Sequence, residues 1–434
     1  MHEQLQSMTT APANAIRGEI TVPGDKSISH RSIMLGSLAG GTTRITNFLR
    51  GEDNFSTMGA FRAMGVPIED DGQTVTVHGV GLHGLQEPGD LLDCGNSGTT
   101  IRLMTGLLSG QSFFSVLTGD QYLRKRPMKR VTEPLRRMGA LIAGRGNGTL
   151  APLAITGSVL SGICYDSPIA SAQVKSSLML AGLYAHGETS ITEPTLSRDH
   201  SERMFRYFGA NLATSGTTVT LRGGQELQGR EINVPGDISS AAFFLVAALV
   251  VPGSELLICN VGVNPTRTGV IDILQAMGGD IVLQNQREVS GEPVADLLVR
   301  SSRLKGIEIG GDVVPRAIDE FPVICVAAAL AEGITTLRDA RELRVKETDR
   351  IAAIAAGLRT VGSGQIVETD DGMVIEGVEK LQGGMVQSFG DHRIAMSLSV
   401  AALACRSQVT VDDVACVATS FPGFFELLNK VALR

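Results

Sequence analysis

A lysine, a serine and an arginine stand together at the start of a predicted helix near the N-terminus. The stretch GDKSISHRS places Lys26 and Ser27 in the first turn and Arg31 about one turn later. Free N–H groups at a helix start favour an anion, and a lysine beside an arginine fork suits phosphate or carboxylate. An ordinary helix start with surface charges fits the same residues. This stretch alone leaves both interpretations open.

Further groups of residues have the types that bind anions. In GNSGTT, Asn96 precedes Gly98, and glycine lets backbone amides approach a ligand closely, although a capped helix start explains the same pattern. Four arginines lie 11 to 13 residues before recurring glycines, which puts each in the loop or first turn of an equivalent helix: Arg126, Arg198, Arg267 and Arg350. A positive side chain gains nothing from a helix N-terminus, so this placement indicates anion capture, or descent of the repeat alone.

Two stretches near the C-terminal end could transfer protons. RAIDEFPV sets Asp319 and Glu320 beside a strongly apolar helix, where partial desolvation would raise a carboxyl pKa, although a helix N-cap aspartate fits equally. LRVKETDRI places Lys346 and Arg350 four apart, on one expected helical face, with Glu347 beside them. Arg393 stands near the start of an alanine-rich helix in FGDHRIAMS. A solvated charged face is the alternative for both stretches.

Composition excludes several classes of protein. The 434 residues carry a net charge of −7, which argues against a nucleic-acid carrier. The six cysteines are scattered without a C-x-x-C, so we expect reduced thiols, with no disulfide framework and no metal site. The first eighteen residues lack the apolar core of a signal peptide, so we expect no secretory signal, and the longest apolar run, 241–251, is too short to span a bilayer. We expect a soluble, cytoplasmic protein.

The elements that position these residues form a repeat. VPGDKS at 22–27 returns as VPGDIS at 234–239, and an apolar residue plus glycine ends a helix-like stretch at Gly65, Gly139, Gly209, Gly278 and Gly362. Their spacings of 74, 70, 69 and 84 residues indicate about six α/β units, each with two helices and a few strands. We predict two similar domains, 23–236 and 1–22 plus 237–434, joined by crossover strands at the two hexapeptides. A cleft between them is the default ligand site. GRGNG at 144–148 predicts a hairpin turn.

The order of the motifs matches a known family. The chain resembles the 5-enolpyruvylshikimate-3-phosphate synthases, enolpyruvyl transferases of the shikimate pathway, over essentially its whole length. Eight stretches fall in that family's order: GDKSISHRSIML, GNSGTTIRL, LRKRPMKRV, SAQVKSSLMLAGL, SRDHSERM, AIDEFPV, LRVKETDRI and GDHRIAMS. The resemblance implies two domains, each of three βαβαββ-like units. It also implies transfer of the enolpyruvyl group of phosphoenolpyruvate to the 5-hydroxyl of shikimate 3-phosphate, with release of phosphate.

The resemblance assigns residues to each substrate. It implies that no metal and no organic cofactor are needed. From charge and apolar runs we expect no nucleic acid or membrane partner, and we also expect a monomer. The residues implied for shikimate 3-phosphate are Lys26, Ser27, Arg31, Ser171, Ala172, Gln173, Arg198, Asp319 and Lys346. Those implied for phosphoenolpyruvate are Lys26, Asn96, Gly98, Arg126, Gln173, Glu347, Arg350 and Arg393. Asp319, Glu347 and Lys26 are the implied catalytic residues, and which of them makes each proton transfer is open.

Two alternative functions compete with this interpretation. The UDP-N-acetylglucosamine enolpyruvyl transferases share the fold and usually carry a reactive cysteine in a mobile loop, but the matching stretch GDQYLRKRPMKR has none. A non-catalytic anion-binding protein would not need Asp319 and Glu347 beside cations. One departure concerns the C-terminus, where many members carry lysine just before FP and this chain has Thr419 and Ser420. The resemblance also implies a target of glyphosate, which competes with phosphoenolpyruvate.

Overall fold

The structure is a computed structural model that describes residues 7–434, and it divides into two compact units. Unit 1 contains residues 7–23, 235–287 and 293–434, and unit 2 contains 24–234 and 288–292. The chain therefore passes between the units four times. Two passages lie at the repeated hexapeptides, whereas the other two flank residues 288–292, which the sequence pattern had left in the segment 237–434.

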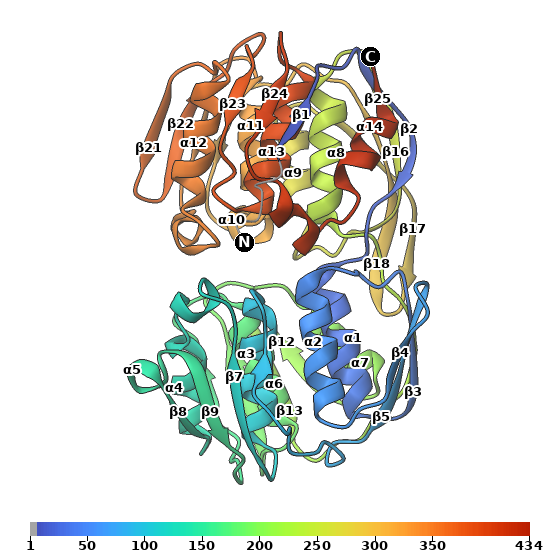
Figure 1. Cartoon of the computed structure of the whole chain (residues 1–434), viewed down its shortest axis with the longest axis vertical. Coiled ribbons are helices and arrows are strands. Elements are labelled where there is room, and N and C mark those ends of the chain that lie inside the picture. The colour runs from blue at the N-terminus through green and yellow to red at the C-terminus, as the bar shows by residue number, and fades with distance from the viewer. Residues whose placement is uncertain (1–6) are drawn as a thin grey trace. The chain divides into compact units, whose positions relative to one another are not determined.

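Three mixed sheets make up the strand content of unit 2 (Figure 1). The first contains β14 (Leu227–Gln228), β3 (Ala39–Thr46), β5 (Thr74–Val80) and β4 (Ile68–Asp70), with β15 (Glu231–Asn233) also paired to β3. The second contains β6 (Leu92–Asp93), β7 (Phe114–Thr118), β9 (Leu150–Thr156) and β8 (Leu141–Gly144). The third contains β10 (Cys164–Asp166), β11 (Glu188–Thr192), β13 (Thr218–Arg222) and β12 (Leu212–Ser215).

Each sheet of unit 2 is accompanied by two principal helices. They are α1 (Lys26–Leu38), α2 (Glu52–Ala63), α3 (Gly98–Ser109), α4 (Lys129–Arg137), α6 (Ala172–Gly182) and α7 (His200–Tyr207). A 3-10 turn, η1 (Leu123–Lys125), precedes α4. The short turn α5 (Arg145–Gly148) joins the antiparallel strands β8 and β9, with Asn147 at φ 56°, so the hairpin turn expected at GRGNG is confirmed.

Unit 1 repeats this plan with three sheets of its own. The first contains β17 (Asp280–Val289), β18 (Glu292–Arg300), β16 (Glu255–Gly262), β2 (Ala15–Thr21) and β25 (Ala432–Leu433). The second contains β19 (Glu308–Ile309), β20 (Ile334–Leu337), β22 (Gly372–Glu376) and β21 (Ile366–Thr369). The third contains β1 (Met8–Thr10), β24 (Val409–Val411) and β23 (Gly384–Val386).

The helices of unit 1 follow the same alternation. They are α8 (Ile238–Val250), α9 (Gly269–Ala276), α10 (Val313–Ala317), α11 (Phe321–Ala329), α12 (Arg350–Thr360), α13 (His392–Leu403) and α14 (Phe424–Val431). Two 3-10 turns, η2 (Arg341–Val345) and η3 (Ala415–Thr419), precede α12 and α14. Helices α8, α11 and α13 contact one another and are buried on nearly every side, as expected of helices that are apolar all round (Figure 1).

One strand topology recurs through the molecule, which confirms the predicted repeat. In the second sheet of unit 2, β6 runs parallel to β7, and β9 is antiparallel to both β7 and β8. The sheets of β10 and β19 use the same order. The sixth repeat includes β1, which pairs antiparallel with β24, so the N-terminal segment contributes a strand to the third sheet of unit 1.

The five repeated glycines end helices in the way that the pattern predicted. Their φ values lie between 81° and 103°, in the left-handed region that glycine adopts without a steric cost, at Gly65, Gly139, Gly209, Gly278 and Gly362. Each unit also has a separate apolar core of its own. The repeat therefore fixes where these five helices end.

Candidate functional site

In unit 2, three buried helices begin with capped first turns. Asp25 caps α1, Ser97 caps α3 and Ser171 caps α6, each accepting a hydrogen bond from a backbone N–H three residues later. Side-chain contacts join these turns: the Thr57 hydroxyl of α2 lies 2.7 Å from that of Thr100, and Gln173 Nε2 donates to Thr99 Oγ1 at 3.2 Å. The helix starts together supply positive potential for an anion.

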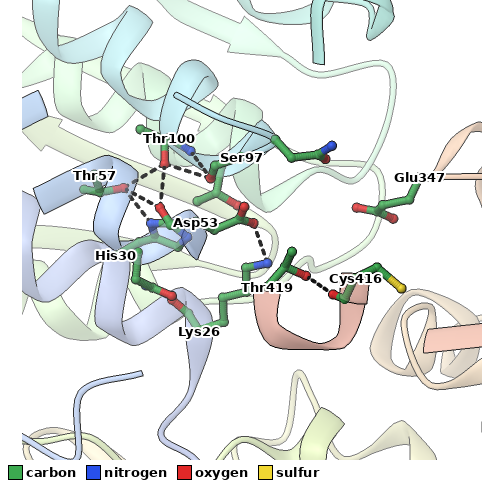
Figure 2. A network of polar contacts seen from close by, with 12 residues as sticks. Lys26, His30, Asp53, Thr57, Ser97, Thr100, Glu347, Cys416 and Thr419 are labelled. Atoms are coloured by element: carbon green, nitrogen blue, oxygen red, sulfur yellow. Dashed lines mark hydrogen bonds and ion pairs between the residues drawn. The ribbon is translucent and has the colours of Figure 1, made fainter. Parts of the chain in front are cut away.

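Lys26 is paired with a carboxylate that the sequence analysis did not single out. Its Nζ lies 2.5 Å from Oδ2 of Asp53, in the first turn of α2 (Figure 2). Asn54 adds a hydrogen bond from Nδ2 to the Lys26 carbonyl at 3.2 Å. The Lys26 side chain keeps 22% of its surface exposed, and the ion pair with Asp53 orients its ammonium.

Arg31 is buried, with 5% exposed, and its guanidinium is hydrogen bonded on three sides. Nε donates to Ser201 Oγ and Nη2 to Ser176 Oγ, both at 2.7 Å, and Nη1 donates to the Ser27 carbonyl at 3.1 Å. Burial lowers the pKa of Arg31 to about 10, which leaves it protonated at neutral pH. Arg198 contributes to this lowering, which places a second positive charge near Arg31.

Asn96 and Arg126 form a second cationic corner in unit 2. Arg126 Nη2 donates to Asn96 Oδ1 at 2.6 Å, and Asn96 Nδ2 donates to Asp120 Oδ2 at 2.7 Å. Gly98 is the first residue of α3, and a Cβ built on it would lie 3.2 Å from Arg126 Nη1. The structure thus brings Arg126 together with Asn96 and Gly98, which were predicted from a different motif.

The first turn of α6 carries the remaining predicted residues of unit 2. Gln173 Oε1 accepts a hydrogen bond from Nη1 of Arg102 at 2.7 Å, and the Ser171 backbone N–H donates to Glu193 Oε1 at 2.8 Å. Ala172 is the first helical residue. Arg102 was not predicted, although an arginine inside the apolar run TTIRLMTGLL was a signal for a specific partner.

In unit 1, Arg350 is the centre of a carboxylate cluster. Its side chain is 1% exposed and lies 2.8 Å from Asp391, 2.6 Å from Glu347 and 3.3 Å from Asp319. Burial by itself lowers the pKa of Arg350, but Asp391, Glu347 and Asp319 raise it above the usual value. Asp391, which also caps α13, was missed although it stands two residues before the predicted Arg393.

Asp319 lies among cations. Lys346 Nζ is 3.4 Å from its Oδ1, and Arg393 Nη1 donates to its backbone carbonyl at 3.0 Å. All five residues predicted in unit 1 therefore meet, with Arg350 and Glu347 completing the set. Asp319 and Glu320 stand directly before the apolar helix α11, as expected, with the Asp319 side chain 15% exposed and Glu320 fully buried. The alternative of a helix N-cap aspartate is wrong, because Glu320 occupies the N-cap position of α11.

Two further expectations need correction. Lys346 and Arg350 do not share a helical face, because α12 begins at Arg350 and Asp349 is its N-cap. They converge through Asp319 instead. Arg267 lies before α9 as expected, but it is buried and donates to Ser239 Oγ at 2.7 Å and to Asp237 at 3.2 Å. An external anion is not needed to explain that arginine.

Comparison with known proteins identifies the family of the chain. The family described as EPSP synthase (3-phosphoshikimate 1-carboxyvinyltransferase) matches residues 10–428. The chain belongs to the EPSP synthase family. A relative from Geobacter sulfurreducens named 3-phosphoshikimate 1-carboxyvinyltransferase is 71% identical over 99% of this chain and 100% of its own length. One from Geotalea daltonii is 69% identical over the same shares.

Solved structures of EPSP synthase agree in fold. A structure of EPSP synthase from Acinetobacter baumannii is 52% identical, covers 99% of this chain and 98% of its own, and superposes with a TM-score of 0.90. A second structure from that organism has 51% identity and a TM-score of 0.89. Within residues 7–434, no helix is long and apolar enough to cross a membrane.

Two features of this EPSP synthase family member concern its cysteines and the residues that replace the C-terminal lysine of many members. The loop 119–130 has no cysteine, and Cys94 is buried, which together with Asp93 raises the pKa of its thiol and opposes a nucleophilic role. Thr419 ends η3 and donates its hydroxyl to the Cys416 carbonyl at 2.7 Å (Figure 2). That hydroxyl is used within the turn.

Proposed function

We propose that this chain transfers the enolpyruvyl group of phosphoenolpyruvate to the 5-hydroxyl of shikimate 3-phosphate, with the predicted residues in the roles given below. The main observation in support is that residues from eight separate motifs gather into two clusters. One is a set of cation-bearing helix starts in unit 2, and the other is the set of carboxylates and cations around Arg350 in unit 1. Two anionic substrates and a proton-transfer reaction need both kinds of group.

Shikimate 3-phosphate is assigned to residues of both units. Its phosphate is proposed to bind at the helix starts and cations of unit 2, which are Ser27, Arg31, Ser171, Ala172, Gln173 and Arg198. Asp319 and Lys346 of unit 1 are proposed to bind the ring hydroxyls. The 3.4 Å pair between Lys346 Nζ and Asp319 keeps the carboxylate ready to accept the 5-hydroxyl proton.

Phosphoenolpyruvate is assigned to Asn96, Gly98, Arg126 and Gln173 of unit 2 and to Glu347, Arg350 and Arg393 of unit 1, and Lys26 contacts both substrates. A proton adds to the methylene carbon as the hydroxyl oxygen attacks, which gives a tetrahedral ketal. The ketal then loses a proton from its methyl group and expels phosphate. Glu347, 30% exposed and bonded to Arg350, is the group assigned to the carbon-bound proton.

Phosphate release from phosphoenolpyruvate tests the assignment of substrate. We expect release with shikimate 3-phosphate and none with UDP-N-acetylglucosamine. Asp319→Asn should lower kcat at least 100-fold while the affinity for shikimate 3-phosphate stays within about threefold, because charge capture belongs to other residues. Asp312→Asn, an exposed aspartate of the same unit, is the matched control. Turnover of the sugar nucleotide alone, or full activity of Asp319→Asn, would overturn the proposal.

The remaining predictions are a monomer in the cytoplasm that needs no metal. Sedimentation and cell fractionation check the first two. Full activity after chelation checks the third.

A further inference from the structure

A buried lysine and two buried glutamates lie beneath the helix starts of unit 2, and no role assigned above uses them. Lys175 on α6 has Nζ 2.8 Å from Glu193 Oε2 and 2.8 Å from Glu202 Oε1. The three side chains are 2%, 1% and 4% exposed. Two carboxylates with one ammonium are costly to bury, so their retention needs an explanation beyond stability.

Lys175, Glu193 and Glu202, called the triad below, differ in pKa shift and in hydrogen-bond partners. Burial by itself lowers the pKa of Lys175, but Glu202 and Glu193 raise it above the usual value. Burial raises the pKa of Glu202, and its Oε2 is buried without a hydrogen-bond partner among residues 7–434. Glu193, in contrast, has both carboxylate oxygens engaged by backbone and side-chain donors.

Glu193 holds two chain segments that carry proposed substrate residues. Its Oε1 accepts the Ser171 N–H at 2.8 Å, at the start of α6. Its Oε2 accepts the Ser197 hydroxyl at 2.8 Å and the Ser197 N–H at 3.3 Å. Ser197 immediately precedes Arg198. One carboxylate therefore sets the position of Ser171 relative to the loop of Arg198.

The triad also orients Arg31 through neighbouring residues. Lys175 and Ser176 are adjacent on α6, and Ser201 and Glu202 are adjacent on α7. The Lys175–Glu202 pair thus lies beside the Ser176–Ser201 hydroxyl pair, whose oxygens are 2.6 Å apart and both accept from Arg31. Glu202 also raises the pKa of Arg31 against the effect of burial, so its charge acts on the guanidinium.

We propose that Lys175, Glu193 and Glu202 are positioning residues for the phosphate group of shikimate 3-phosphate. The triad fixes the Ser171 turn, the Arg198 loop and the Arg31 fork in one geometry, and its net negative charge balances these cations until the phosphate arrives. It touches none of the residues assigned only to phosphoenolpyruvate. This inference rests on the substrate assignment proposed above.

The test separates the two substrates by steady-state kinetics. In Glu193→Gln the amide nitrogen would face either the Ser171 N–H or the two donors of Ser197, so one of these two segments must shift. We expect KM for shikimate 3-phosphate to rise at least tenfold, with KM for phosphoenolpyruvate within twofold and kcat within threefold. Glu188→Gln, an exposed glutamate on β11 five residues earlier, is the matched control and should match wild type.

A second variant keeps the test decisive if Glu193→Gln does not fold. Ser197→Ala removes one hydroxyl donor to Glu193 and leaves every charge in place, and we expect about a threefold rise in KM for shikimate 3-phosphate alone. Equal rises in both KM values, or a fall in kcat with both KM values unchanged, would overturn the inference. A wild type inactive with shikimate 3-phosphate would instead reject the proposed function.

Discussion

Gly98 shows how little room the structure leaves beside two guanidinium groups. A Cβ at this position would lie 2.8 Å from Arg102 Nη1 and 3.2 Å from Arg126 Nη1. Both atoms are the far ends of flexible side chains, so a methyl group would displace them without blocking the fold. Because Arg126 is assigned to phosphoenolpyruvate, the displacement would be felt in the pocket of that substrate.

Gly98→Ala should therefore separate ligands by length. Glyphosate is longer than phosphoenolpyruvate, and we expect its inhibition constant to rise at least 100-fold while KM for phosphoenolpyruvate rises about threefold to tenfold, because the methyl group acts by a clash. Inhibition at fixed phosphoenolpyruvate measures both.

Gly59→Ala is the control, since no atom lies within 4 Å of a Cβ placed there. Equal losses for the two ligands, or a wild type indifferent to glyphosate, would show that Gly98 does not set this space.

Helices α1, α2 and α3 are joined by a buried chain of polar side chains. His30 Nδ1 lies 2.7 Å from Thr57 Oγ1, which lies 2.7 Å from Thr100 Oγ1, which donates to Ser97 Oγ at 2.7 Å (Figure 2). All four residues are fully buried. Burial, followed by Lys26 and Arg31, lowers the pKa of His30 well below its usual value, so the imidazole is neutral in the folded protein.

This depressed pKa gives a pH dependence with a definite sign. The unfolded chain takes up a proton near pH 6.5 and the folded chain does not, so stability from this group is complete above pH 6.5 and is lost as pH falls. Between pH 7.5 and 5.5 the free energy of unfolding should fall by about 1 kcal/mol through His30, and His30→Asn should remove that fall.

Urea unfolding at the two pH values measures the difference. His78→Asn, at an exposed histidine, is the control and should keep the wild-type slope. An unchanged slope in His30→Asn would mean that His30 is protonated in the folded protein.

Sequence reasoning reached the helix starts more easily than their partners. Arg126 and Arg350 were found by their spacing from Gly139 and Gly362, because each repeat has the same glycine after a helix, which is a local property of the chain. Asp53 and Asp391 were not found, because an ion pair depends on which helix packs beside another. The helix expected from Lys346 onward begins at Arg350, because Asp349 caps it and a four-residue spacing alone does not fix a helix start.

At the scale of the whole molecule, residues 288–292 set this fold apart from two simple halves. They comprise the end of β17, the turn after it and the first residue of β18, two strands of a unit 1 sheet, yet they belong to unit 2. There Glu292 accepts from His200, with Oε1 2.8 Å from Nδ1 and both side chains 3% exposed. Arg203 Nε lies 4.0 Å from the other oxygen. Sequence reasoning could not single out this segment, because it contains neither a repeat nor a motif.

Glu292→Ala should destabilise the protein by about 2 to 3 kcal/mol, because it leaves buried donors without their carboxylate. Urea unfolding of the full chain measures this loss. Glu288→Ala alters an exposed residue of the same five and should cost less than about 0.5 kcal/mol. A similar cost for both variants would show that the buried contact of Glu292 adds nothing.

The interleaved chain path has a consequence for biosynthesis on the ribosome. Strand β1 pairs with β24 in a register that joins Met8 to Val411, and β2 pairs with β16 and β25. These first strands emerge long before their partners and must wait, with Ile16 and Ile20 uncovered, while residues 24–234 are translated. Unit 2 can close once residue 292 has emerged, whereas unit 1 closes only after its last strand. We therefore expect nascent unit 1 to be more prone to aggregation than nascent unit 2, since strands that pair late expose apolar edges for longest.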